Sequence, residues 1–224
     1  MHENEAMENP EEINIFDYLS TKYSDETQKG HRQQLYAAAF DIAQKVVNYG
    51  EITKLDTLIM RDTWECSRTG HQNVMCGALA DAIGFEYPYF EHVELIINSD
   101  GFLNKKELWH TKRMRKKEIN VFRGCSIKEI ESGEFGYSWT LDNEVAHFFA
   151  DAHSGKVVTA KVSGLSHFAV WLDTAESELI ITGMDESDIL SVENANHQID
   201  NMNWTKRKHL TPLQQIKQKR GITA

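Results

Sequence analysis

The sequence predicts an α+β protein with a helical N-terminal half and a β-rich C-terminal half. Between residues 31 and 49, apolar side chains recur every three or four positions, which is typical of an amphipathic helix. From residue 119 onward, short runs rich in valine and isoleucine alternate with turn residues, which is typical of strands. Because one pattern follows the other in a chain of 224 residues, we expect one folded unit rather than two independent domains.

The helical part is expected to extend to about residue 118. Residues 1–12 are acidic and polar, so we expect them to be disordered. The strongest helix covers residues 31–49, and Gly50 follows it at the position of a C-cap. Three further segments complete this part: residues 53–64, residues 72–83 with Gly84 behind them, and residues 89–98, which fit either a helix or a strand.

Two segments are rich in lysine and arginine. The first covers residues 105–117, just before the chain changes character, and the second is a basic tail over residues 205–224. The simplest interpretation of both is a solvated surface. The alternative, contact with an acidic protein partner or with nucleic acid, stays open.

The β-rich part is expected over residues 119–195. Residues 119–122 form a first strand that ends at Arg123 and Gly124. Residues 138–140 precede a helix whose apolar face consists of Val145, Ala146, Phe149 and Ala150. Residues 156–162 alternate like a half-buried strand, with one side formed by Val158, Ala160 and Val162. Further strand-like runs cover residues 167–172, 179–181 and 189–192.

Charge and composition restrict the class of function. The formal net charge of −10 argues against a protein that binds nucleic acid over its whole surface. The three cysteines lack a CxxC spacing, which predicts neither a disulfide framework nor a zinc site. No apolar stretch approaches the length of a membrane-spanning helix, and the N-terminus does not resemble a signal peptide. We therefore expect a soluble cytoplasmic protein that does not act at a membrane.

Three short motifs follow one another at the edges of the expected elements: Arg123-Gly124 after a strand, Ser138-Trp139-Thr140 before a helix, and Glu176-Ser177-Glu178 at the start of a strand. Each has an ordinary structural interpretation. The first could be a surface turn, the second a capped helix start with a core tryptophan, and the third a pair of solvated glutamates. Because strand side chains repeat every two residues, Glu176 and Glu178 are expected on the same face.

Taken together, the order and placement of these motifs resemble those of the arginine–serine–glutamate class of mono-ADP-ribosyltransferases. The Ser-Trp-Thr version with a following Phe-Ala helix is similar to that of small phage and bacterial members. The resemblance covers about residues 119–195. It implies a split, two-sheet mixed β core with an N-terminal helical layer, and one catalytic domain over residues 13–224. Trp139 departs from the family pattern, in which the middle residue of the second motif is usually small.

The resemblance implies that NAD⁺ is a co-substrate and that three residues are catalytic. Glu178 would stabilise the positive charge that develops on the ribose as nicotinamide leaves, and would hold the ribose 2′-hydroxyl. Ser138 would orient Glu178. Glu176 would orient and help deprotonate the acceptor, which a glutamate at this position of the family associates with arginine.

The same resemblance, together with residue chemistry, gives five candidate residues for binding NAD⁺. The guanidinium of Arg123 suits a pyrophosphate, and Gly124 would let the ligand approach the backbone closely. Phe149 would pack against a ring of NAD⁺, although a core position is its ordinary interpretation. The set consists of Arg123, Gly124, Trp139, Thr140 and Phe149. The chain has neither a GxGxxG nor a Walker A motif, so the usual nucleotide cradles are not expected.

The implied reaction transfers ADP-ribose to an arginine of a target protein and releases nicotinamide. No metal is expected, and His147, His153 and His167 are interpreted as surface or core residues. Three alternatives stay open: an NAD glycohydrolase, a catalytically inactive NAD-binding or interaction module, and an enzyme that modifies nucleic acid. Action is expected in the cytoplasm of the producing cell, or of a host cell if the protein is encoded by a phage.

Overall fold

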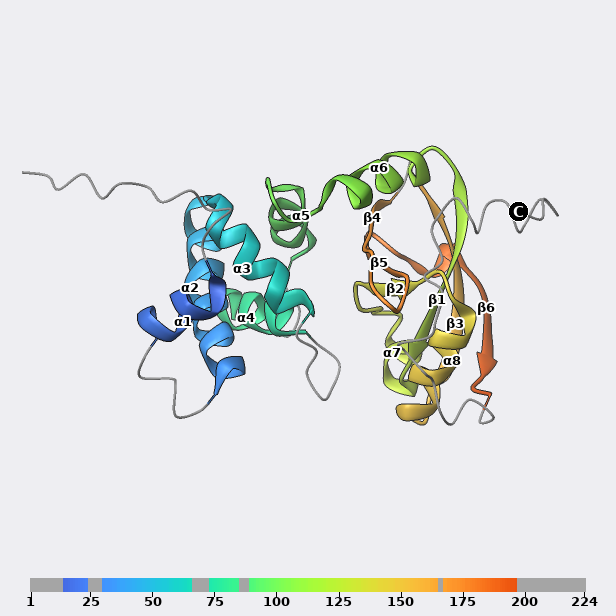
Figure 1. Ribbon diagram of the computed structural model, residues 1–224. Coiled ribbons are helices and arrows are strands. Elements are labelled where there is room, and N and C mark those ends of the chain that lie inside the picture. The colour runs from blue at the N-terminus through green and yellow to red at the C-terminus, as the bar shows by residue number, and fades with distance from the viewer. Residues whose placement is uncertain (1–13, 24–29, 66–72, 85–88, 165–166, 197–224) are drawn as a thin grey trace, which may run out of the picture. The chain divides into compact units, whose positions relative to one another are not determined.

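The computed structural model describes residues 14–23, 30–65, 73–84, 89–164 and 167–196, and the chain divides into two compact units, residues 1–102 and 103–224 (Figure 1). The expectations for residues 1–12 and for the basic tail lie outside the described residues. The sequence predicted one domain whose helical part reaches about residue 118. In the described residues the last helix before the first strand ends at Met114 and that strand begins at Glu118, while the compact units divide near residue 102.

The described elements of the first unit are all helices: α1 (Ile15–Lys22), α2 (His31–Tyr49), α3 (Lys54–Glu65), α4 (Val74–Ile83) and α5 (Phe90–Asn98). The predicted helix over residues 31–49 is confirmed, and Gly50 ends it with a φ of 66°. Gly84 ends α4 in the same left-handed conformation. Residues 89–98, which fitted either a helix or a strand, contain the helix α5.

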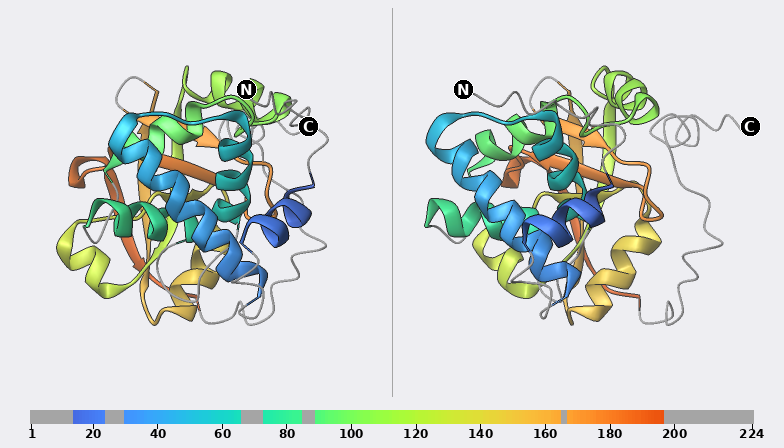
Figure 2. Two further views of the ribbon diagram at one scale, coloured as in Figure 1. Left: turned by 90° about the vertical axis from the view of Figure 1, so that its left-hand side faces the viewer. Right: turned by 60° about the vertical axis from the view of Figure 1, so that its left-hand side comes forward.

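Helix α2 packs against α1, α3 and α4 (Figures 1 and 2). Its buried face includes Leu35, Ile42 and Val46, with alanines between them. The facing helix α4 is buried from Val74 to Ala80 and also contains small side chains. Small residues on both helices allow their backbones to approach closely, so the apolar pattern of the sequence accounts for this unit.

The described residues of the second unit form a six-stranded sheet with three α-helices and a short 3-10 helix. Its elements are α6 (Lys105–Met114), β1 (Glu118–Cys125), α7 (Ile127–Ser132), β2 (Ser138–Thr140), α8 (Asn143–Ala152), β3 (Lys156–Ser163), β4 (Phe168–Trp171), β5 (Glu178–Thr182), η2 (Glu186–Asp188) and β6 (Ile189–Asn194). The described strands lie in the order β4-β5-β2-β1-β3-β6. The α+β class predicted from the sequence is confirmed.

The expectation of a mixed, two-sheet core is wrong for the described strands, because they form one sheet and every pair in it is antiparallel. The sheet is nevertheless narrow at its middle. Strands β1 and β2 share the single register pair Phe122↔Thr140, whereas β1 pairs with β3 along its whole length. The three-residue strand β2 is too short to extend this junction. Two three-stranded halves therefore meet at one pair of residues.

Helix α6 belongs with the sheet and not with the first unit. Thr111 Oγ1 accepts a hydrogen bond from the amide of Trp171 in β4 at 3.0 Å, and Glu107 Oε1 accepts one from the amide of Asp173 at 2.9 Å. The opposite face of the helix is exposed and contains Lys105, Leu108, Trp109, Lys112 and Arg113. The predicted solvated surface of this cationic segment is therefore one face of a helix that packs on β4.

The two faces of the sheet are covered differently. On one face, Val158, Ala160 and Val162 of β3 lie in an apolar core with residues of β1, β2, β4 and β5, as the alternation of the sequence predicted. On the other face, α8 packs against β1 and β3 (Figure 1). Ala146 and Ala150 of α8 form a small buried cluster there with Val157.

At Gly124 the backbone of α8 lies close against β1. A Cβ at this residue would lie 2.5 Å from the carbonyl oxygen of Ala146 and closer still to the amide nitrogen of Ala150. Both atoms belong to helix backbone, so neither moves without displacing α8. Packing of α8 thus gives a structural reason for glycine here, and the approach of a ligand to Gly124 stays a prediction.

Gly124→Ala is therefore expected to lower the free energy of unfolding by about 1–3 kcal/mol, because the added methyl forces α8 away from the sheet. Urea-induced unfolding followed by circular dichroism measures the change. Asn143→Ala, at an exposed position of the same helix, is the control and should change stability by no more than about 0.5 kcal/mol. Equal stability of Gly124→Ala and wild type would contradict this account of the packing.

Candidate active site

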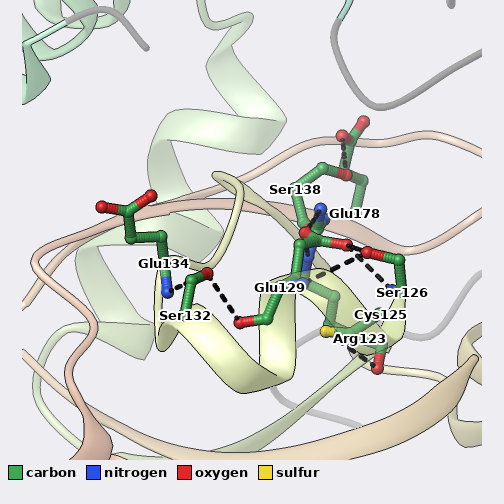
Figure 3. A network of polar contacts seen from close by, with 8 residues as sticks. All are labelled: Arg123, Cys125, Ser126, Glu129, Ser132, Glu134, Ser138 and Glu178. Atoms are coloured by element: carbon green, nitrogen blue, oxygen red, sulfur yellow. Dashed lines mark hydrogen bonds and ion pairs between the residues drawn. The ribbon is translucent and has the colours of Figure 1, made fainter. Parts of the chain in front are cut away.

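The second and third motifs meet where β2 lies beside β5 (Figure 3). Ser138 is the first residue of β2 and Glu178 the first residue of β5. The antiparallel register pairs Thr140 with Glu178 and Ser138 with Ile180, so the two functional side chains are diagonal neighbours on one face. The Ser138 hydroxyl donates a hydrogen bond to Glu178 Oε1 at 2.6 Å. The structure thus brings together the serine and the glutamate that the sequence singled out.

Glu176 does not continue the strand, because the chain turns at Ser177. This serine has a φ of 49° and is 1% exposed. Left-handed backbone is unfavourable for a residue other than glycine by about 1 kcal/mol or more, so contacts must hold it. The amide of Ser177 donates to the carbonyl of Thr174 at 3.0 Å, and the amide of Leu141 donates to the carbonyl of Ser177 at 3.1 Å. The expectation that both glutamates lie on one face of a regular strand therefore needs correction.

Thr140 fixes the position of Glu176 through the backbone. Its hydroxyl donates to the carbonyl oxygen of Glu176 at 2.5 Å and accepts from the amide of Asp142 at 3.0 Å. The side chain of Thr140 is 5% exposed. In this structure Thr140 ties the end of β2 to the turn that precedes β5.

The electrostatic environment of Glu176 differs from that of an ordinary surface carboxyl. The pKa of Glu176 is raised to about 7, mainly by burial and to a smaller extent by the negative charge of Glu178. The carboxyl therefore exchanges a proton near neutral pH. The repulsion between the two close glutamates contributes to this shift.

Arg123 lies inside β1, two residues before its end, and its guanidinium contacts both α7 and β2 (Figure 3). Nε and Nη2 donate to Glu129 Oε1 at 3.3 and 2.7 Å. Nη1 donates to the backbone carbonyl of Ser138. The first motif is thereby connected to the second, because Arg123 binds the backbone carbonyl of Ser138. The other edge of the guanidinium binds the carboxylate of Glu129.

Glu129 was not singled out by the sequence analysis. It is the N3 residue of a capping box in α7, and the pattern Ser126-x-x-Glu129 could have revealed its place at the start of a helix. Burial opposes ionisation of this carboxyl, but the charge of Arg123 and hydrogen bonds from Arg123 and Ser126 outweigh it and lower its pKa. The carboxylate is therefore charged. Its pairing with Arg123 could not be read from the capping pattern.

The remaining candidates for cofactor binding lie in different environments. Trp139 is 2% exposed, with its ring 5.9 Å from that of Phe135, so the structure makes it a core residue and leaves it no surface for a cofactor. Its side chain points to the apolar face because β2 alternates, which the motif alone did not reveal. Phe149 is half-buried on α8 with its ring 5.5 Å from Phe148.

Histidines near the site make contacts within the protein. His167 Nε2 lies 2.9 Å from Asp188 Oδ2, and His147 Nδ1 accepts from the amide of Asn196 at 3.1 Å. Among the residues that the structure describes, no three or more His, Cys, Asp or Glu side chains are arranged to hold a metal ion. In the same part of the chain, no helix is long and apolar enough to cross a membrane.

Comparisons with protein-family models, with curated proteins and with solved structures find no match to this chain. A function must therefore be argued from the residues and the geometry of the site.

The raised pKa of Glu176 makes folding stability depend on pH. The folded carboxyl titrates near 7 and the unfolded one near the ordinary value of 4.5, so the folded state binds more protons between these values and loses stability as pH rises. Glu176→Gln, which is neutral at every pH, is expected to be more stable than wild type by about 1–3 kcal/mol above pH 7. The difference should disappear below pH 4.5.

Urea unfolding at a series of pH values measures this difference. Glu131→Gln is the control, because Glu131 is exposed on α7 and the same substitution there removes a solvated charge. Its stability relative to wild type should stay nearly constant with pH. A Glu176→Gln variant that followed the same flat profile would contradict the buried environment of Glu176.

Proposed function

We propose that this chain is an NAD-dependent mono-ADP-ribosyltransferase that transfers ADP-ribose to an arginine of a target protein and releases nicotinamide. The observation that carries the proposal is the hydrogen bond from the Ser138 hydroxyl to Glu178. It joins the second and third motifs, and Arg123 of the first motif bonds to the carbonyl of the same serine. Ser138 and Glu178, which lie 40 residues apart in the sequence, and Arg123 therefore converge on one point.

The described strands form one antiparallel sheet, and its narrow junction between β1 and β2 is the feature that most nearly corresponds to the split implied by the motifs. Because Phe122↔Thr140 is the single register pair between β1 and β2, the sheet consists of two three-stranded halves joined at one pair of residues. We propose that this junction corresponds to the split of the transferase core. The residues with functional chemistry lie beside it, on β1, β2 and β5.

Glu178 is proposed to act on the ribose. As the bond between the ribose C1′ and the nicotinamide nitrogen breaks, its electron pair leaves with nicotinamide and positive charge develops on the ribose. A carboxylate near that charge stabilises the transition state more than the ground state. The hydroxyl of Ser138 holds one carboxylate oxygen, so the side chain of Glu178 is oriented before the substrate binds.

Glu176 is proposed to act on the acceptor. A guanidinium nitrogen of the target arginine attacks C1′ and forms the new carbon–nitrogen bond, and its proton passes to the carboxylate of Glu176. A general base is most effective when its pKa is close to the working pH. The pKa of Glu176, about 7, meets this condition at neutral pH.

The substrate side of the proposal follows from the same motifs. NAD⁺ is the proposed co-substrate. The residues expected to border it are Arg123 and Gly124 of the first motif, Thr140 of the second motif, and Phe149 of α8. The proposed reaction involves no metal ion, and its partner is a protein with an accessible arginine. We propose that it takes place in the cytoplasm of the producing cell or of a phage host.

Glu178→Gln is expected to lower both nicotinamide release and ADP-ribosyl transfer about 100-fold or more, because the charge that stabilises the transition state is lost. Chromatography of nicotinamide, with protein, NAD⁺ and cell lysate present, measures the first activity. Mass spectrometry of ADP-ribosylated proteins measures the second. Glu131→Gln, with an exposed carboxyl on α7, is the control and should retain wild-type rates. Activity of Glu178→Gln equal to that of this control would reject the assignment.

Glu176→Gln is expected to separate transfer from hydrolysis. The amide cannot accept the proton of an arginine acceptor, so modified protein should fall at least about 100-fold. Nicotinamide release with water as acceptor should persist, since Glu178 is intact. The ratio of free ADP-ribose to protein-bound ADP-ribose measures the effect. Unchanged transfer would exclude Glu176 as the residue that deprotonates the acceptor, and free ADP-ribose alone from the wild type would indicate a glycohydrolase.

A further inference from the structure

Glu129 is a charged, buried residue outside the three motifs, and both of its carboxylate oxygens are held. Oε1 accepts two hydrogen bonds from Arg123, at 2.7 and 3.3 Å. Oε2 accepts from the amide and the hydroxyl of Ser126 at 3.0 and 3.2 Å. The side chain of Glu129 is therefore fixed between the first turn of α7 and the guanidinium.

The guanidinium of Arg123 in turn holds β2 where the sheet is weakest. Strands β1 and β2 share the single pair Phe122↔Thr140, so the ladder between them is nearly absent. Nη1 of Arg123 donates to the carbonyl of Ser138, a few residues along the same junction. The guanidinium of Arg123 thus donates to β2 in place of a backbone amide of β1.

Gly136 leaves the space that the guanidinium fills. A Cβ at Gly136 would lie 2.5 Å from Nη2 of Arg123 and 3.1 Å from its Cζ. The backbone there has an ordinary conformation, because Gly136 is not among the glycines with positive φ. A side chain at Gly136 would therefore push the end of the Arg123 side chain away from this position.

The contacts form one continuous series from Glu129 to Arg123, to the carbonyl of Ser138, and from the hydroxyl of Ser138 to Glu178 (Figure 3). Displacing the carbonyl of Ser138 also moves its hydroxyl, since both belong to one residue. A shift of about 1 Å in a group that orients a catalytic residue is enough to lower a rate about 100-fold.

We propose that Glu129 is a positioning residue of the active site, which fixes Arg123 against the carbonyl of Ser138 and thereby fixes the hydrogen bond between Ser138 and Glu178. The catalytic consequence rests on the proposed function. The geometric part concerns β2 itself and does not depend on the reaction. Because Nε and Nη2 of Arg123 donate to Glu129 in this arrangement, they do not bind the pyrophosphate of NAD⁺.

Glu129→Gln tests the proposal. The side-chain oxygen of glutamine can still accept a hydrogen bond from the backbone amide of Ser126, but the substitution removes the charge that holds Arg123. We expect kcat for nicotinamide release to fall about 10–100-fold while the Kd of NAD⁺, measured by calorimetry, changes less than about twofold. Glu131→Gln makes the same substitution at an exposed position of α7 and should change neither quantity. Glu129→Asp, which keeps the charge, should recover part of kcat.

Two results would overturn the proposal. Unchanged kcat in Glu129→Gln, with only a lower unfolding free energy, would make Glu129 a helix-capping residue and nothing more. Unchanged kcat with tighter binding of NAD⁺ would mean that Glu129 competes with the cofactor for Arg123.

Hydrogen exchange separates failure of this proposal from failure of the proposed function. If wild type releases no nicotinamide from NAD⁺, the proposed function fails, and exchange of the backbone amides of β2 still tests Glu129. Glu129→Gln should then exchange these amides faster than wild type and Glu131→Gln, under conditions in which all three are folded. Equal exchange in the three proteins would overturn the positioning role.

Discussion

The half-buried ion pair between the guanidinium of Arg123 and Glu129, at the junction of β1 and β2, is the interaction on which the arrangement of the site depends. Arginine remains charged when buried and has donors in a planar fork, so it can bond a carboxylate on one edge and a backbone carbonyl on another. A buried cation is costly without a counter-charge, which Glu129 supplies. The ion pair thus allows two halves of a sheet that share one residue pair to keep a fixed separation.

Strand β2 connects this junction to both glutamates of the third motif. It has only three residues, and the hydroxyls of the first and the third bind different groups. Ser138 donates a hydrogen bond to the carboxylate of Glu178, and Thr140 donates one to the backbone carbonyl of Glu176. One glutamate is consequently held by its side chain and the other by its backbone. The left-handed turn at Ser177 makes this division geometrically feasible, because it takes Glu176 out of the strand while Glu178 remains paired in it.

Local patterns of the sequence sufficed to predict some of these features and not others. Helix α2 with its cap at Gly50, and the buried side of β3, follow from periodicity and were confirmed. Strand direction depends on contacts between distant segments, so an antiparallel sheet could not be read locally. Serine rarely adopts positive φ, so the turn at Ser177 had no signal. The ion pair of Glu129 had only a helix-capping signal, since its partner lies on another element.

The two glutamates need opposite properties for the proposed chemistry, and the structure provides them by different means. Two close carboxylates repel, so one of them tends to take up a proton near neutral pH. The hydrogen bond from Ser138 orients the carboxyl of Glu178. Glu176 is buried instead, and its pKa rises to about 7. An oriented carboxyl and an exchangeable proton therefore lie two residues apart, and the charge of the nearby Arg123 is balanced by Glu129.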